Sequence, residues 1–247
     1  MVYHLEVFQG TSCEFSLYQK DERWGGKEQG DMSACLGVLV LRAAEHGYGF
    51  VTMSHCSAVP VVQCDAQLDA GKYLVVPIVF NASVLKTEAY GGVLAVHSSC
   101  AAAVSKGAVH AEVVARGLLL ACQRKGKMDS MGMSNVVLRT LFTGSGGAII
   151  AAENSGSGVL LTVELDCSEC FNLTTSRGSL VTQDVVPEHH FQILQILSVL
   201  EHGAAVQYRS KTKIQAKGAF GGGGDGGGMG QHQPGVSKQG LHAPVRQ

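Results

Sequence analysis

Residues 135–166 read NVVLRTLFTGSGGAIIAAENSGSGVLLTVELD and contain three apolar runs of strand length. The links TGSG and NSGS separate these runs and supply the glycine and serine residues at which a chain reverses direction. Short aliphatic runs between such links are typical of successive strands. This stretch therefore predicts a sheet in the second half of the chain.

The first half shows the same alternation of short apolar runs and turn residues, with the links GGKEQGD, AEHG, DAG and NASVLK between the runs. The expected strands are HLEVFQ, ACLGVLVLRA, YGFVTM, PVVQC, KYLVVPIVF and GGVLAVHS. In KYLVVPIVF both alternating sets of side chains are apolar, which predicts a strand covered on two sides. Pro77 donates no ladder hydrogen bond and so places this strand at an edge or a bulge. The spacing favours a β-sandwich for residues 1–98.

Two helices are expected after residue 98. VHAEVVARGLLLACQ predicts the first, although Gly117 and the valines lower its helix propensity. The second is expected from about Pro187 to His202. Its apolar residues fall on one helical face, with Gln195 on a more polar side. The residues of that face are Ile193, Ile196, Leu197 and Leu200.

The expected fold class is α+β and strand-rich, divided into three parts. Residues 1–98 form a β-sandwich-like lobe, and residues 99–216 form a mixed α+β lobe with about two helices. Residues 217–247 include GAFGGGGDGGGMGQHQPG, a composition that predicts a disordered glycine-rich tail.

Composition and charge exclude several classes of protein. Hydrophobic residues make up 45% of the 247 residues and the net charge is -1, so we expect a folded core and no attraction to nucleic acid. No apolar run approaches the ~18 residues of a membrane span. The densest basic group is explained as a solvated strand face; it consists of Arg209, Lys211, Lys213 and Lys217. Eight scattered cysteines beside aliphatic residues, without a signal peptide in residues 1–10, predict a reducing, cytoplasmic location.

The sequence motifs assign no catalytic, cofactor-binding or metal-binding residue, and no cofactor is expected. Cys167 and Cys170 form a single CxxC, whereas a structural zinc site needs four ligands and a thioredoxin-type site needs a strand-to-helix junction. His189 and His190 are adjacent and lack the i, i+4 spacing of a helical metal pair. Cys170 alone among the cysteines precedes an aromatic residue, and its surroundings predict strand rather than the helix start of a papain-like nucleophile.

Two stretches carry a family resemblance. HSSCAAAV and the longer CSECFNLTTSRGSLVTQDVVPEHHFQILQILSVLEHGAAV, residues 167–206, resemble the C-terminal homology domain of the small optic lobes calpains. LDAGKYLVVPIVF is similar to a strand-turn-strand unit of calpain β-sandwich domains. The resemblance covers about residues 1–216.

This resemblance implies an accessory domain of an intracellular cysteine-protease family. Its full members carry N-terminal zinc fingers and a papain-like core, and neither part is present in this sequence. The resemblance therefore transfers no catalytic residue, and it implies a regulatory or interaction module whose partner is a protein or the calpain protease core. The alternatives are a free-standing adaptor or protein-binding module and, from a different class, a small hydrolase or lyase.

Overall fold

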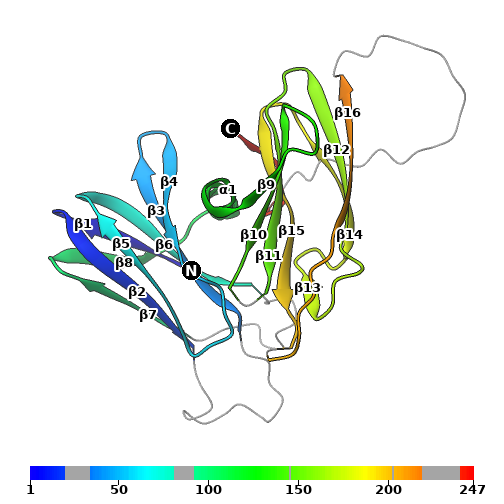
Figure 1. Ribbon diagram of the computed structural model, residues 1–247. Helices are drawn as coiled ribbons and strands as arrows, with labels where there is room; N and C mark the ends of the chain where they lie inside the picture. Colours follow the sequence, from blue (N-terminus) through cyan, green and yellow to red (C-terminus); the bar gives the residue numbers. More distant parts are fainter. Residues whose placement is uncertain (20–33, 81–91, 145, 202, 219–239) are drawn as a thin grey trace, which may run out of the picture.

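A computed structural model describes residues 1–19, 34–80, 92–144, 146–201, 203–218 and 240–247. It is strand-rich, and the sheets are antiparallel (Figure 1). The expected turns GGKEQGD and NASVLK and the glycine-rich centre of the expected tail lie outside the described residues.

The first eight strands form a β-sandwich of two sheets. One sheet has the order β4-β3-β6-β1-β8 and the other the order β5-β2-β7. A buried apolar cluster that includes Phe15, Val38 and Val75 fills the space between them. The strands are β1 (Val2–Val7), β2 (Thr11–Gln19), β3 (Leu36–Ala44), β4 (Gly47–Met53), β5 (Val61–Leu68), β6 (Gly71–Val79), β7 (Gly92–Ser98) and β8 (Ala102–Gly107). The larger sheet thus continues past residue 98, where the sequence analysis places a lobe boundary.

Strand β6 has apolar cover on both faces, as predicted. Val75 belongs to the sandwich core, whereas Leu74 on the opposite face belongs to a second cluster. The placement of this strand at an edge is wrong, because β6 lies between β3 and β1. Pro77 is tolerated because it pairs with Val38 of β3, while the ladder to β1 extends only as far as Val75.

The first expected helix is confirmed as α1 (Ala111–Lys125). Gly117 faces β3, where an added Cβ atom would lie 2.8 Å from Leu39 Cδ2 and 2.9 Å from Leu41 Cδ1. The glycine that lowers helix propensity therefore allows the helix to approach the sheet closely. No helix in the described ranges combines the length and apolar character needed to cross a membrane.

A second pair of sheets follows α1. One has the order β13-β15-β11-β10-β9, with β17 also paired to β15, and the other has the order β14-β12-β16. Leu161, Val163 and Leu194 belong to the buried cluster between them. The strands are β9 (Lys127–Asp129), β10 (Val136–Phe142), β11 (Ala148–Asn154), β12 (Val159–Asp166), β13 (Leu173–Thr175), β14 (Val181–Val186), β15 (His190–Val199), β16 (Lys211–Gly218) and β17 (Val245–Arg246). The three runs of residues 135–166 are thus the strands β10, β11 and β12.

The second expected helix is wrong, because residues 190–199 form the strand β15. A β-bulge shifts its register against β11 so that Ile193 pairs with Ala151 and Gln195 with Ile150. The extra residue places Ile193 and Ile196, three residues apart, in the same buried cluster. A bulged strand buried on both faces thus imitates the spacing of a helical face. In the described part of the chain, α1 is the one α-helix.

Two details of that expected helix are also corrected. Leu197 faces the cluster between the second pair of sheets, not the one that holds Ile193, and Leu200 lies beyond the strand and is exposed. Gln195, expected on a polar side, is completely buried.

A third core joins the two halves of the molecule. It combines Leu41 and Leu74 of the first sandwich with Leu118 of α1 and Ile149 and Ile193 of the second pair of sheets. In Figure 1, α1 lies between the two groups of strands. Ser198 Oγ on β15 donates a buried hydrogen bond of 2.5 Å to the carbonyl oxygen of Phe80, just beyond β6.

The expected tail, residues 217–247, includes the end of β16 and the described strand β17. β16 extends to Gly218, and β17 pairs with β15 through Val245 opposite Phe191. Val245 is buried in the third core. The glycine-rich composition predicted a coil, but Val245 near the end of this segment is buried, and Leu241 is partly buried.

Candidate interaction site

A polar network within residues 167–206, the longer stretch of the family resemblance, joins the β13–β14 connection, β14 and β15. Arg177 Nη1 donates two hydrogen bonds, one to Asp184 Oδ2 at 2.5 Å and one to the carbonyl oxygen of Leu194 at 3.1 Å. Gln192 Nε2 donates to Asp184 Oδ1 at 3.0 Å. Burial raises the pKa of Asp184, and the Arg177 guanidinium opposes that rise. Because Asp184 is almost inaccessible, this ion pair holds a carboxylate inside the fold.

The same network continues to the C-terminal segment, residues 240–247. Gln195 Nε2 donates to the carbonyl oxygen of Ser179 at 2.8 Å, and Ser176 Oγ accepts from the Ile196 amide at 3.1 Å. His242 Nε2 lies 3.1 Å from Ser176 Oγ, and His242 Nδ1 lies 2.9 Å from the carbonyl oxygen of Ile193. A carbonyl oxygen only accepts, so Nδ1 carries a proton. Burial lowers the pKa of His242, which favours the neutral ring.

The Ser176–His242 contact resembles part of a nucleophilic dyad but lacks the arrangement that such chemistry needs. In a hydrolase the imidazole is oriented by a third group, which in the common triads is a carboxylate or an amide side chain, and the serine oxygen is free to attack. Here Nδ1 donates to a backbone carbonyl, and the serine oxygen is already engaged by the Ile196 amide. The contact fits a structural tie between β15 and the C-terminal segment better than a catalytic site.

A cavity of about 210 Å³ lies beside this network, between α1, the end of β6 and β15. Its lining is mainly apolar and includes Ile78, Phe80, Leu118, Ile196 and Leu241, together with the hydroxyl residue Ser176. We call the surface formed by α1, the end of β6 and β15 the groove. Because its walls come from both halves of the chain, the groove depends on the third core.

The cysteines of the CxxC lie in the turn after β12. The Cys170 amide donates to the carbonyl oxygen of Cys167 at 3.0 Å, and Cys170 Sγ donates to the carbonyl oxygen of Arg209 at 3.1 Å. Burial raises the pKa of Cys167 to about 12, so its thiol is held protonated. All eight cysteines are free thiols. Within the described ranges, no three His, Cys, Asp or Glu side chains are grouped so that they could hold a metal ion.

Cys100 differs from the buried thiols. Hydrogen bonds from Gln9, Ser99 and Thr11 lower its pKa. The Cys100 amide donates to Thr11 Oγ1 at 3.1 Å, and its thiol lies 3.8 Å from the carbonyl oxygen of Gly10. These neighbours are amide, hydroxyl and carbonyl groups, whereas a cysteine protease requires an imidazole beside the sulfur.

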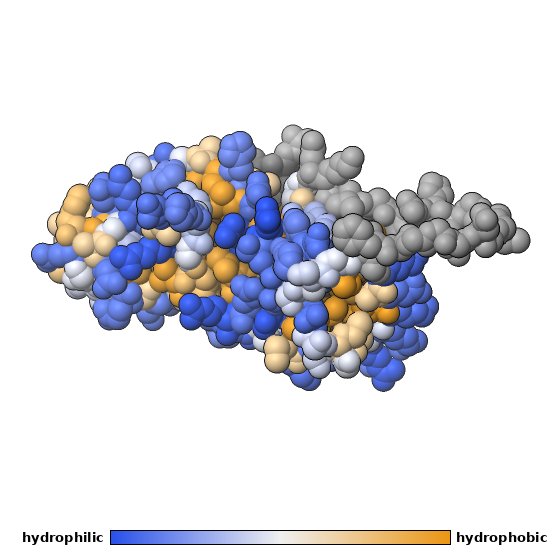
Figure 2. All heavy atoms as spheres, turned by 90° about the horizontal axis from the view of Figure 1, so that it is seen from above, coloured by the Kyte–Doolittle hydropathy of each residue, from blue (hydrophilic) through white to orange (hydrophobic). Residues whose placement is uncertain are grey.

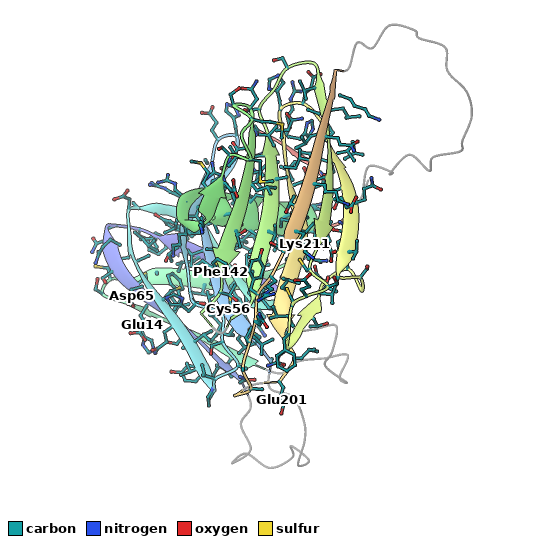
Figure 3. The ribbon with its side chains drawn as sticks, turned by 45° about the vertical axis from the view of Figure 1, so that its right-hand side comes forward. Glu14, Cys56, Asp65, Phe142, Glu201 and Lys211 are labelled. Carbon is teal, nitrogen blue, oxygen red and sulfur yellow. The ribbon has the colours of Figure 1, made fainter. Side chains whose placement is uncertain are left out.

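The basic group lies mainly on the outer strand β16, where Lys211 is seen in Figure 3. Lys211 forms an ion pair with Glu169, and Lys213 Nζ lies 3.0 Å from Glu164 Oε1. These exposed pairs agree with the predicted solvated strand face. The lysines also protect an edge strand against pairing with another chain.

Glu188 and His189 do not open a helix but form the turn before β15, which begins at His190. Glu188 Oε2 accepts from the Gly158 amide at 2.5 Å, and His189 has a positive φ of 54°. A residue in that left-handed region does not belong to a regular helix. The expected first helical turn is therefore replaced by a tight entry into the strand.

Sequence comparison supports a relationship with calpains over part of the chain. Residues 121–218 match the family model described as the Calpain-D-like C-terminal domain. The match begins within α1 and ends with β16, so it contains the second pair of sheets except β17, and the polar network except His242. No solved structure matches the chain significantly. Residues 121–218 are thus similar to the C-terminal domain of Calpain-D-like proteins.

Proposed function

We propose that this chain is a non-catalytic, cytoplasmic interaction module of a calpain-like cysteine protease, of the small optic lobes type. The observation that carries the proposal is the match of residues 121–218 to a calpain C-terminal domain. The network residues Arg177 and Asp184 lie inside that match and hold the β13–β14 connection against β15. The module acts by docking to the protease core or to another protein.

Several surface features support a binding role. Phe142 is 50% exposed, and its ring contacts Tyr208 edge to face with the centroids 5.2 Å apart. Apolar areas reach the surface over both the first sandwich, at the left of Figure 2, and the second pair of sheets. Exposed aromatic and apolar areas are typical of protein-binding surfaces. The formal charge of -1 offers little attraction for nucleic acid.

The proposal is tested by activity and binding assays on the whole chain. Residues 1–247 are expected to cleave neither casein nor fluorogenic peptides, with or without millimolar calcium, because the thiol with a lowered pKa, Cys100, has no imidazole among its bonded neighbours. Cys100→Ser and Ser176→Ala are matched controls that identify the source of any hydrolysis. Proteolysis that calcium stimulates and a thiol alkylator blocks would contradict a non-catalytic role.

The binding arm uses calorimetry with a recombinant small optic lobes type protease core. Saturable binding is expected. Heat changes no larger than those of buffer dilution would contradict docking to the protease core. They would favour the alternative of a free-standing adaptor module.

A further inference from the structure

The C-terminal segment, residues 240–247, is held in the groove by a small set of contacts. Val245 inserts into the third core, and β17 pairs with β15 through Val245 opposite Phe191 and Arg246 opposite His190. The Gln247 amide donates to the carbonyl oxygen of His189 at 3.0 Å. The segment thus extends the sheet by a short antiparallel strand.

Two further features give this contact specificity. The His242 ring uses both nitrogens, one toward the carbonyl oxygen of Ile193 and one toward Ser176 Oγ. Leu241 lines the cavity of about 210 Å³ without filling it. The groove therefore provides main-chain pairing, a polar contact for an imidazole, and an apolar space beside the leucine.

We propose that the groove is a binding site for an extended peptide and that residues 240–247 are its resident, displaceable occupant. Main-chain pairing that supplies affinity, with pockets that select side chains, is how sheets recognise extended peptides. The ligand is an unfolded peptide segment with apolar residues at the positions of Leu241 and Val245 and a histidine after the first. This site belongs to the chain itself, so its existence does not depend on a protease partner.

The extent of pairing supports displacement. β17 has 2 residues, and its ladder to β15 joins two residue pairs, whereas the β11 ladder runs the full length from Ala148 to Asn154. Opening β17 therefore leaves β15 paired to β11. The covalent link gives the resident segment a high effective concentration, so a free peptide competes poorly until that segment is weakened.

The test is a fluorescence anisotropy titration of a labelled peptide, GLHAPVRQ, against the full chain and two variants. Val245→Asp places a charge in the third core and should release the resident segment, whereas Arg246→Asp changes an exposed neighbour. The Val245→Asp chain is expected to bind the peptide at least about tenfold more tightly than the wild-type and Arg246→Asp chains, because the cis competitor is removed. A peptide carrying Val245→Asp should not bind.

A second peptide examines the cavity. Replacement of Leu241 by phenylalanine in the peptide should tighten binding to the Val245→Asp chain, because the larger ring occupies the space beside Ile78 and Leu118. Unchanged or weaker binding would show that the cavity does not select the ligand.

Three results overturn the proposal. The first is that the peptide fails to bind the folded Val245→Asp chain, and the second is equal binding to all three chains. Should Val245→Asp lose the wild-type circular dichroism spectrum, the same titration is made with His242→Ala. The third result is loss of the fold in both Val245→Asp and His242→Ala. It would show that the segment is an integral part of the core and not a displaceable ligand.

Discussion

Replacing Arg177 with methionine tests whether the polar network holds a charged carboxylate inside the fold. The change removes the guanidinium that donates to Asp184 and to the carbonyl oxygen of Leu194 and keeps a long apolar side chain in its place. Asp184 keeps one hydrogen bond, from Gln192. We therefore expect an unpaired negative charge in a position where the side chain is 2% exposed.

The expected loss of unfolding free energy follows from the burial of Asp184. Removing one partner of a buried ion pair costs about 3 to 5 kcal/mol of unfolding free energy. Arg177 itself is 23% exposed, so its replacement should lie near the lower end, at about 3 kcal/mol. The matched control is Arg42→Met, which removes a surface pair with Asp69 whose side chains are 45% and 82% exposed. That control should cost less than about 1 kcal/mol.

The pH dependence of the stability lost in Arg177→Met provides a second test of the buried charge. Burial already raises the pKa of Asp184 above its ordinary value, and loss of Arg177 should raise it further. A raised folded-state pKa means that the folded protein binds a proton more readily than the unfolded chain, so stability falls as the pH rises through the folded pKa. The cost of Arg177→Met should therefore be smaller at pH 5 than at pH 7.5.

Urea denaturation of the wild type and both variants at the two pH values measures these costs. The double variant Arg177→Met with Asp184→Asn should recover at least about 1 kcal/mol at pH 7.5, since it removes the unpaired charge. A loss below about 1 kcal/mol for Arg177→Met, or one that is the same at both pH values, would refute the buried ion pair as the source of stability.

Two further predictions concern the helix and the C-terminal segment. Gly117→Val should lower the free energy of unfolding by about 1 to 3 kcal/mol, because the new side chain meets buried leucines of β3. The control Arg116→Val, on the exposed side of α1, should change it by no more than about 0.5 kcal/mol. Equal effects of the two variants in thermal melts would contradict close packing of α1. Burial lowers the pKa of His242, with Arg177 opposing and Asp184 favouring its charged form, so the unfolded or undocked segment binds a proton more readily. Hydrogen-exchange protection of residues 245–247 should therefore weaken as the pH falls below about 6.5, and His242→Gln should remove that dependence.

Much of the fold follows from local sequence patterns. The short apolar runs between glycine-rich links predicted strands such as β10 to β12, and the 109–123 run predicted α1. The links are local, so the strands could be predicted from them, although PVVQC, residues 60–64, marks only part of β5 (Val61–Leu68). The double cover of β6 was also predictable because both of its side-chain sets are apolar.

The misassigned strand β15 shows where local pattern is insufficient. Its run FQILQILSV has apolar residues on both faces, and the bulge at Leu194 changes the alternation in the middle. Gln192 and Gln195 are polar but buried, because Asp184 and the carbonyl oxygen of Ser179 supply their partners. Those partners are distant in sequence, so the network could not be recognised without the tertiary structure. The two glutamines inside an apolar run were the one local signal.

The docking of residues 240–247 was missed for a similar reason. A histidine, a leucine and a valine after a glycine-rich stretch carry no periodic signal. Their burial depends on a groove whose walls come from α1, β6 and β15, and only the folded chain brings these elements together.

The third core also constrains the order in which the protein can be completed during synthesis. Strands β3 and β6 leave the ribosome before α1 and β11, and Leu41 and Leu74 share the third core with residues of those later elements. The apolar face of a nascent first sandwich therefore lacks part of its cover until α1 and then residues as far along as Ile193 have been made. In the cell, this interval is when a chaperone would be needed most.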